Sequence, residues 1–133
     1  MRRLRVLGPL EVDGAAEVLG PRDRVVVSAL ALRPGERVDA ETLAEALWGE
    51  EPPASAAKVV QGCVSRLRKA LGTAAIETVD GGYRVRHDEL DIDRQQFEDQ
   101  VERARGYLAT RTPERAIPLL TDALALWRGP AFG

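Results

Sequence analysis

The hydrophobic period changes several times within the first 87 residues, and the order of these changes constrains the fold more than any other feature. At the start, Leu4 and Val6 alternate with Arg3 and Arg5, which predicts short antiparallel strands. The period then becomes helical, and the apolar spacing predicts three helices at about residues 22–32, 40–48 and 55–71. A hairpin is expected last, with strands 76–79 and 83–86 around the turn Asp80-Gly81-Gly82.

The third expected helix has one apolar side and one basic side. At 100° per residue, its apolar positions fall within about 60° of each other, and they are Val60, Val64, Leu67 and Leu71. The opposite side carries Ser55, Lys58, Gly62, Ser65, Arg66 and Lys69. No acidic residue occurs between Glu51 and Glu77, so this helix is locally +4. The order strand, strand, helix, helix, basic helix, hairpin predicts a winged helix-turn-helix, in which the last helix enters the DNA major groove.

The net charge of the whole chain conceals this basic helix. A total of −2 argues against a polyanionic partner. Residues 1–87, however, carry 13 Lys/Arg against 12 Asp/Glu, whereas residues 88–133 carry 6 against 9. The change falls in a short acidic stretch without helical periodicity. We therefore expect an α+β winged-helix domain at residues 1–87, an acidic linker at 88–93 and an all-α domain at 94–133.

The last forty residues predict a helix pair. Phe97, Val101, Ala104 and Leu108 share one helical face, and Ala116, Leu120, Ala123 and Trp127 repeat that spacing after an expected cap at Thr112 and first turn at Pro113. Pro118 should kink or loosen the second helix. Two such helices cannot bury both their faces alone and need neighbours. We therefore expect a truncated helical domain, whose helix pair packs on the winged helix or on another copy and buries Leu124, Trp127 and Phe132.

The composition gives little support for an enzyme. The single cysteine, Cys63, and the single histidine, His87, exclude a disulfide framework, a Cys/His zinc site and most nucleophile–histidine arrangements. We find no phosphate-cradling glycine motif, and expect neither metal nor cofactor. Cys63 is expected to be a small buried hydrophobe, with redox sensing as the alternative. No apolar run reaches about eighteen residues and no secretory signal is present, so we expect a cytoplasmic protein.

Short motifs spread over the whole chain resemble one known family. They are Leu7-Gly8-Pro9-Leu10, Leu19-Gly20-Pro21-Arg22, Leu47-Trp48-Gly49, Pro52-Pro53, the run Val64 to Gly72, Gly82-Tyr83-Arg84-Val85 and Leu126-Trp127-Arg128-Gly129-Pro130. In this order they resemble the Streptomyces antibiotic regulatory protein (AfsR/DnrI/RedD) family of transcription activators. The resemblance implies an OmpR-type winged helix followed by a tetratricopeptide-like bacterial transcriptional activation domain. It also implies binding to direct repeats near promoters and recruitment of RNA polymerase.

The resemblance also implies which residues contact DNA. Arg66 and Arg68 match the DNA-contacting arginines of the OmpR-type recognition helix, and the candidate neighbours are Lys58, Gln61, Ser65 and Lys69. Arg66 is better centred on the polar side and is expected to read bases, whereas the stem of Arg68 should reach toward a phosphate.

Arg22 and Arg24 match backbone-contacting positions of the family, and we expect them on phosphates.

The wing departs from the family pattern, because Asp80 stands where a basic residue is common. Either Arg84 and Arg86 replace that contact or the wing contributes little. Trp48 and Tyr83 follow apolar periodicity and are expected in the core.

Together these observations predict a sequence-specific DNA-binding transcriptional activator with no enzymatic activity. Its expected partners are promoter DNA and RNA polymerase, bound as a homodimer or as tandem protomers. Two alternatives remain: a protein-interaction module that uses the helix pair with the winged helix as scaffold, and a truncated competitor that occupies promoters without activating transcription.

Overall fold

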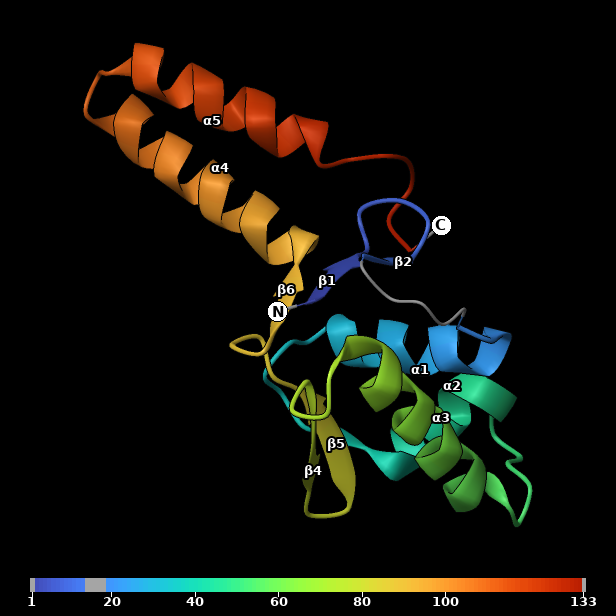
Figure 1. The fold of residues 1–133 in the computed structure, drawn as a ribbon. Helices are drawn as coiled ribbons and strands as arrows, with labels where there is room; N and C mark the ends of the chain where they lie inside the picture. The colour runs from blue at the N-terminus through green and yellow to red at the C-terminus, as the bar shows by residue number, and fades with distance from the viewer. Residues whose placement is uncertain (1, 14–18, 133) are drawn as a thin grey trace. The chain divides into compact units, whose positions relative to one another are not determined.

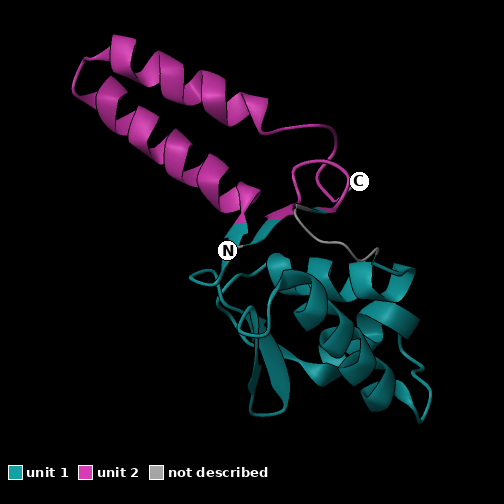
Figure 2. Ribbon diagram, in the orientation of Figure 1, with its two compact units in different colours: residues 1–3, 12–91 teal, residues 4–11, 92–133 magenta. Residues whose placement is uncertain are grey.

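The chain divides into two compact units in the computed structural model, which describes residues 2–13 and 19–132. Unit 1 contains Met1–Arg3 and Val12–Asp91, and unit 2 contains Leu4–Glu11 and Ile92–Gly133. Figure 2 colours the two units separately. Each unit is therefore built from two separate stretches of the chain.

Unit 1 has the winged-helix architecture that the sequence predicts. Its helices are α1 (Pro21–Ala31), α2 (Ala40–Trp48) and α3 (Ala56–Leu71), and its hairpin strands are β4 (Ile76–Val79) and β5 (Gly82–Val85). The three helices pack on one another, and the hairpin lies beside α3 (Figure 1). The core between them is aliphatic and includes Val26, Leu30, Leu43, Leu67 and Ile76, each at most 1% exposed. The fold class expected from the sequence is confirmed.

A third strand completes the wing sheet and was not predicted. It is β3 (Val38–Asp39), which pairs antiparallel with β5, so that the sheet order is β3-β5-β4. Gly82 lies opposite Asp39, and a Cβ at this glycine would collide with the Val38 carbonyl oxygen. The close approach of two backbones thus requires glycine here. With only two residues, β3 is too short to show an alternating pattern.

The first strands form a second sheet. β1 (Arg2–Arg5), β2 (Glu11–Asp13) and β6 (Leu90–Ile92) have the order β2-β1-β6. β6 lies within residues 88–93, where the sequence predicted a linker. Leu90 and Ile92 are buried, and Asp91 between them is exposed. This period of two is a strand signal that the dense acidic residues obscured. The domain boundaries themselves stay a prediction.

Unit 2 contains the predicted helix pair. α4 (Asp93–Ala109) and α5 (Pro113–Ala125) run antiparallel in Figure 1 and pack on each other along their length. Their fully buried apolar residues are small: Ala104, Ala116 and Ala123. Phe97 and Trp127 meet edge to face, with ring centroids 5.6 Å apart.

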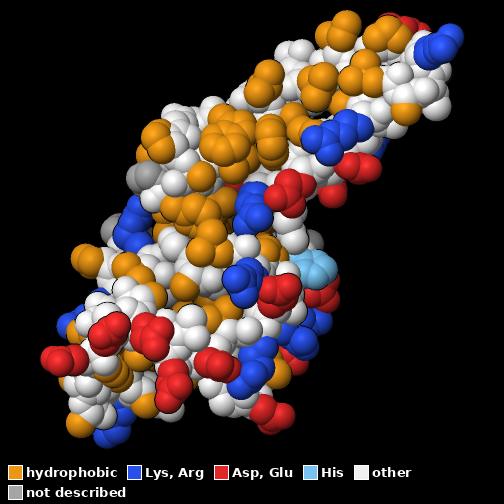
Figure 3. Space-filling view, turned by 180° about the vertical axis from the view of Figure 1, so that it is seen from behind, with side chains coloured by type: hydrophobic (Ala, Val, Ile, Leu, Met, Phe, Trp, Pro, Cys, Tyr) orange, Lys and Arg blue, Asp and Glu red, His pale blue; other side chains and the backbone are white. Residues whose placement is uncertain are grey.

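Large apolar side chains of this pair remain exposed. The exposed fractions of Leu108, Ile117, Leu124 and Trp127 are 51, 62, 67 and 40%. We call these four residues the apolar strip. Hydrophobic side chains gather along the helix pair in Figure 3. Within the single chain Leu124 and Trp127 are exposed and Phe132 is half-buried, so the burial expected for them against the winged helix or another copy stays a prediction.

Within unit 2, the segment Leu4–Glu11 forms hydrogen bonds with residues at the start of α4 and after the end of α5. The buried carboxylate of Asp93, at the start of α4, accepts hydrogen bonds from the backbone N–H groups of Val6 (2.8 Å) and Leu7 (3.3 Å). After α5, the N–H of Arg128 donates to the Leu7 carbonyl and that of Phe132 to the Val6 carbonyl, both at 2.8 Å. Four backbone groups of this short segment therefore bond to the helical part.

Asp39 and the expected cap Thr112 occupy cap positions without acting as side-chain caps. Asp39 precedes α2, but its carboxylate pairs with Arg37. Thr112 precedes α5, and its hydroxyl donates back to the Tyr107 carbonyl at 3.0 Å. Pro118 lies inside α5, whose bounds extend well beyond it, so the expected loosening does not end the helix.

Among the residues that the structure describes, no helix combines the length and apolar character needed to cross a bilayer.

Candidate nucleic-acid interface

Helix α3 presents a polar side away from the core. Val60, Val64, Leu67 and Leu71 are at most 2% exposed, as the sequence predicted. Four of the candidate DNA-contacting residues are exposed on this helix, and their side chains make no ion pair or hydrogen bond within the described part of the chain: Lys58, Gln61, Ser65 and Lys69. Such side chains meet a partner without first breaking contacts of their own.

Arg66 is held by a carboxylate of α1. Its Nε lies 3.0 Å from both oxygens of Asp23, and its Nη2 lies 3.0 Å from Oδ1. The Arg66 side chain is 54% exposed, whereas Asp23 is 3% exposed. Burial alone would raise the pKa of Asp23, but hydrogen bonds from Arg66 and Cys63 and the Arg66 charge outweigh it, so this pKa lies below its ordinary value. The pair is thus ionised at neutral pH.

Arg68 joins α3 to the wing. Its Nε and Nη2 donate to the Ile76 carbonyl at 3.0 and 2.9 Å, and Nη2 also donates to the Thr78 hydroxyl at 2.9 Å. In the structure, therefore, this guanidinium fixes strand β4 against α3, where the sequence placed it on a phosphate. The contact with strand β4 was not predicted, and a phosphate contact of Arg68 stays a prediction.

Both candidate arginines of the wing are paired with carboxylates. Arg84 donates to Glu77 across the hairpin, at 2.9 Å from Nε and 2.6 Å from Nη2. Arg86 pairs with Asp88 at 2.8 Å. Asp80 at the tip is exposed, so the wing offers DNA little uncompensated positive charge.

Arg37 is a cation near the tip that the sequence analysis missed. Its Nε donates to the Asp80 carbonyl at 2.7 Å, and its Nη2 pairs with Asp39. Arg37 and Asp80 are 43 positions apart, and only the pairing of β3 with β5 brings them together. No local pattern could have revealed this contact.

The two α1 arginines differ in their surroundings. The guanidinium of Arg22 lies 5.6 Å from the ring centroid of Trp48 in a cation–π contact. Arg24 is half-buried and has an interaction of its own. Trp48 and Tyr83, expected in the core, are half-buried.

A hollow of about 400 Å3 opens at the start of α1 and is lined by Gly20, Pro21, Arg22, Asp23 and Arg66.

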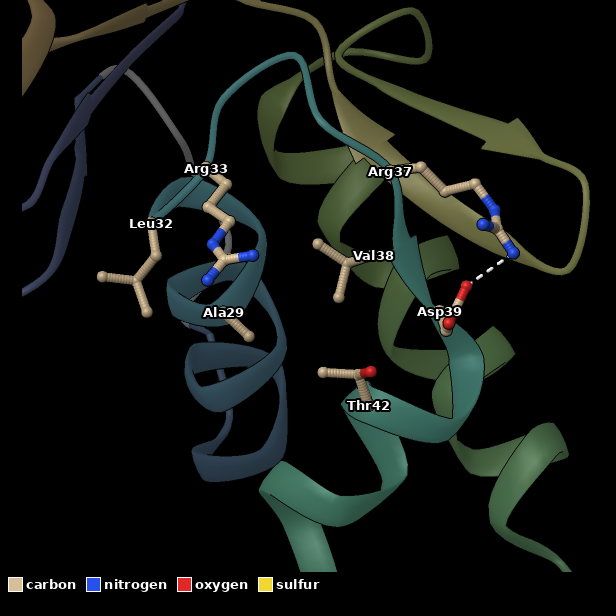
Figure 4. A pocket seen from close by; sticks show the side chains of 7 residues that line it. All are labelled: Ala29, Leu32, Arg33, Arg37, Val38, Asp39 and Thr42. Atoms are coloured by element: carbon tan, nitrogen blue, oxygen red, sulfur yellow. Dashed lines mark ion pairs between the residues drawn. The ribbon is translucent and has the colours of Figure 1, made fainter.

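A second hollow of about 400 Å3 lies between α1, β3 and α2. Figure 4 shows its lining, in which Arg37 points to Asp39 at one edge and Arg33 lies at the other, with the smaller Ala29, Val38 and Thr42 between them. Leu32, at the rim, is 53% exposed.

Cys63 and His87 occupy different environments. The Cys63 thiol is fully buried, and burial first, then Asp23, raises its pKa. The expectation of a small buried residue is confirmed. His87 is exposed. Within the described ranges, no three His, Cys, Asp or Glu residues cluster as a metal would require.

Comparison with protein families gives two matches that cover most of the chain. Residues 14–85 match the family described as "Transcriptional regulatory protein, C terminal", and residues 92–133 match the "Bacterial transcriptional activator domain". The first match spans more than half of the sequence and lies within unit 1, without the first and last residues of that unit. These regulators are not enzymes as a class.

Individual relatives agree with both matches. The regulatory protein AfsR of Streptomyces coelicolor is 40% identical over 96% of this chain, which covers 13% of AfsR. The transcriptional regulator RedD of the same organism is 32% identical over 97% of the chain, which covers 40% of RedD. The chain thus spans less than half the length of these relatives.

A solved structure shares the fold. Mycobacterium tuberculosis EmbR, in complex with a low-affinity phosphopeptide, superposes with a TM-score of 0.85 and 29% sequence identity, over 98% of this chain and 37% of EmbR. The chain therefore belongs to the Streptomyces antibiotic regulatory protein family of transcriptional activators, with an OmpR-type winged helix followed by a bacterial transcriptional activator domain.

Proposed function

We propose that the chain binds promoter DNA sequence-specifically through α3, at direct repeats, and recruits RNA polymerase. The observation that carries this proposal is the set of exposed, unengaged side chains Lys58, Gln61, Ser65 and Lys69 on a helix that has no acidic residue of its own. In a winged helix this is the element that fits the major groove. The direct repeats, the polymerase and the cytoplasmic location rest on membership of the family.

The two kinds of side chain have separate roles. Lys58 and Lys69 neutralise phosphates and release counterions, which supplies affinity for any sequence. Gln61 and Ser65 carry no charge, and they can hydrogen-bond base edges in the groove. Affinity and sequence preference are therefore carried by different residues of one helix. Arg22, Arg24, Arg66, Arg68, Arg84 and Arg86 belong to the proposed interface as well, and each is engaged within the protein.

The dependence of DNA affinity on salt tests the assignment of α3. The plot of log K against log salt concentration has a negative slope, and each lost phosphate contact reduces the magnitude of that slope by about 0.9. Lys58→Ala should reduce the magnitude of the slope by this amount for specific and random duplexes alike. The matched control is Arg33→Ala, which removes an exposed cation from the turn after α1. Equal slopes for wild type and Lys58→Ala on both duplexes would contradict the proposal.

Base reading is tested with the neutral residues. Gln61→Ala and Ser65→Ala should each weaken a selected site by about 1–3 kcal/mol if the residue reads a base directly, and random duplex by much less. Transcription with purified polymerase then separates an activator from a competitor. Occupancy of the promoter without stimulation would identify the competitor.

One observation favours a second function, protein binding by the helix pair. The apolar strip exposes large side chains on a helix pair whose fully buried apolar residues are alanines, and exposed apolar patches mark interaction sites. A partner bound there should be insensitive to salt, in contrast to DNA. Leu124→Ser should then weaken that partner and leave DNA affinity unchanged.

A further inference from the structure

The pairing of Arg66 with Asp23 restricts what this arginine can offer to DNA. A guanidinium has five N–H donors: one on Nε and two on each Nη. The Nε donor and Nη2 face the two oxygens of Asp23, and Nη2 also lies 3.5 Å from Cys63 Sγ. The donors that remain are the two on Nη1.

The carboxylate is itself held firmly in place. Asp23 is 3% exposed, lies in the first turn of α1 and accepts a hydrogen bond from the Gly20 N–H at 3.3 Å. Removing Arg66 from it would leave a buried carboxylate without its cation, which is costly. Arg66 therefore does not turn freely toward a partner, although half of its side chain is exposed.

Arginine reads guanine by giving two parallel donors to O6 and N7. The side-on edge that combines Nε and Nη2 is the edge that Asp23 occupies. We propose that Asp23 is a specificity-determining residue, which holds this edge of Arg66 so that Arg66 meets DNA through Nη1 alone. This inference rests on the proposed function of α3. It also narrows the expectation that Arg66 reads bases, because only the Nη1 donors of its guanidinium remain for DNA.

The first test is selection of binding sites from random duplexes by wild type and by Asp23→Asn. The asparagine keeps the shape of the side chain but removes its charge and one of its two acceptor oxygens, so that it no longer holds both Nε and Nη2 of Arg66. The variant should gain a preference for guanine at one position, by roughly five- to one-hundred-fold, as a bidentate arginine contact gives. Asp23→Glu keeps a carboxylate and should retain the wild-type preference. An unchanged selected sequence for Asp23→Asn would overturn the inference.

A second variant gives an answer even if Asp23→Asn fails to fold. Arg66→Lys keeps a cation beside Asp23, but a lysine has no second edge. If Arg66 already acts through one nitrogen, the base preference of Arg66→Lys should stay within roughly three-fold of wild type at every position, well under the loss of a bidentate contact. Loss of a guanine preference in this variant would show that wild-type Arg66 reads bases with two donors, and would overturn the inference.

The outcome for wild type separates this inference from the proposed function. Selection of no sequence by wild type, together with no effect of Lys58→Ala on any duplex, would contradict both. Selection of a defined sequence by wild type, with the same sequence selected by Asp23→Asn, would contradict the role of Asp23 alone.

Discussion

The surroundings of Cys63 lower the reactivity of its thiol. Its thiol is fully buried beside Asp23, and both burial and that carboxylate raise its pKa. The reactive form of cysteine is the thiolate. A modifying reagent should therefore react with Cys63 only as fast as the protein opens. The measurement is the alkylation rate at increasing urea concentration, which should follow the unfolded fraction. Fast alkylation without urea would contradict this.

The Asp23–Arg66 pair makes stability depend on pH. The folded pKa of Asp23 lies below its ordinary value of 3.8. Its contribution is therefore complete above that value and is lost as the pH falls through the folded pKa. Asp23→Asn should lower the free energy of unfolding by about 1–3 kcal/mol at pH 7, and by progressively less in acid. Urea unfolding at pH 7 and below pH 4 measures both, and a difference that did not shrink in acid would contradict the assignment.

The sequence could predict which residues lie on the exposed side of α3, because helical periodicity decides that locally. Lys58, Gln61, Ser65 and Lys69 lie where expected. The partners of Arg66 and Arg68 could not be predicted, because Asp23 is 43 positions away and the Ile76 carbonyl has no sequence signature. The exposed positions of α3 were therefore predictable, and the hydrogen bonds and ion pairs of its arginines were not.

At the level of elements, Gly106 is a point of weakness in α4. A Cβ at this glycine would meet nothing within 4 Å, and the residue lies inside a helix. Gly106→Ala should raise the free energy of unfolding by about 0.5–1 kcal/mol, because alanine loses less backbone entropy on folding.

The matched control is the same change at Gly82, where a Cβ would collide with the Val38 carbonyl. Gly82→Ala should destabilise the protein. Thermal unfolding of both variants measures the difference, and a lower melting temperature for Gly106→Ala would contradict the expectation.

The helices were predictable from the sequence, and the short strands β3 and β6 were not. Helices α1, α2 and α3 begin and end within about one residue of expectation, and α5 begins at the expected Pro113, because a helical stripe and a nearby Pro or Gly mark them. Helix α4 begins at Asp93, four residues before the first apolar residue of its expected stripe, Phe97. β3 has two residues and exists only because β5 pairs with it. In β6 buried and exposed residues alternate as in a strand, but the acidic residues around it are typical of a linker. Pairing across the chain, and not local pattern, creates such strands.

At the level of the whole molecule, the stability of unit 2 depends on the beginning of the chain. Asp93 is 2% exposed and accepts the N–H groups of Val6 and Leu7. Asp93→Ala should cost about 2–4 kcal/mol, because two buried donors lose their acceptor.

Hydrogen exchange should detect this loss as faster exchange in α4 and α5. The matched control is Asp99→Ala, which removes an exposed carboxylate from the same helix. Equal protection in both variants would show that the Leu4–Glu11 segment does not support the helix pair.

The acidic excess of the chain lies before the helix pair and not in it. Residues 92–133 contain six Asp/Glu and six Arg, so the helix pair is neutral. The acidic excess comes from Asp88, Glu89 and Asp91, which immediately precede it. A partner of the helix pair would therefore be selected by the apolar strip and not by net charge.

The alternation of the chain between the two units has a consequence for its synthesis. Leu4, Val6, Leu7 and Leu10 leave the ribosome well before Asp93, Arg128 and Phe132, whose groups bond to Val6 and Leu7. Unit 1 has all its helices once residue 71 has emerged, whereas unit 2 must wait for Phe132. During translation the N–H and carbonyl groups of Val6 and Leu7 therefore lack their hydrogen-bond partners until unit 2 is complete. The apolar side chains of this segment are exposed during that time, and the nascent chain is then open to chaperones and to aggregation.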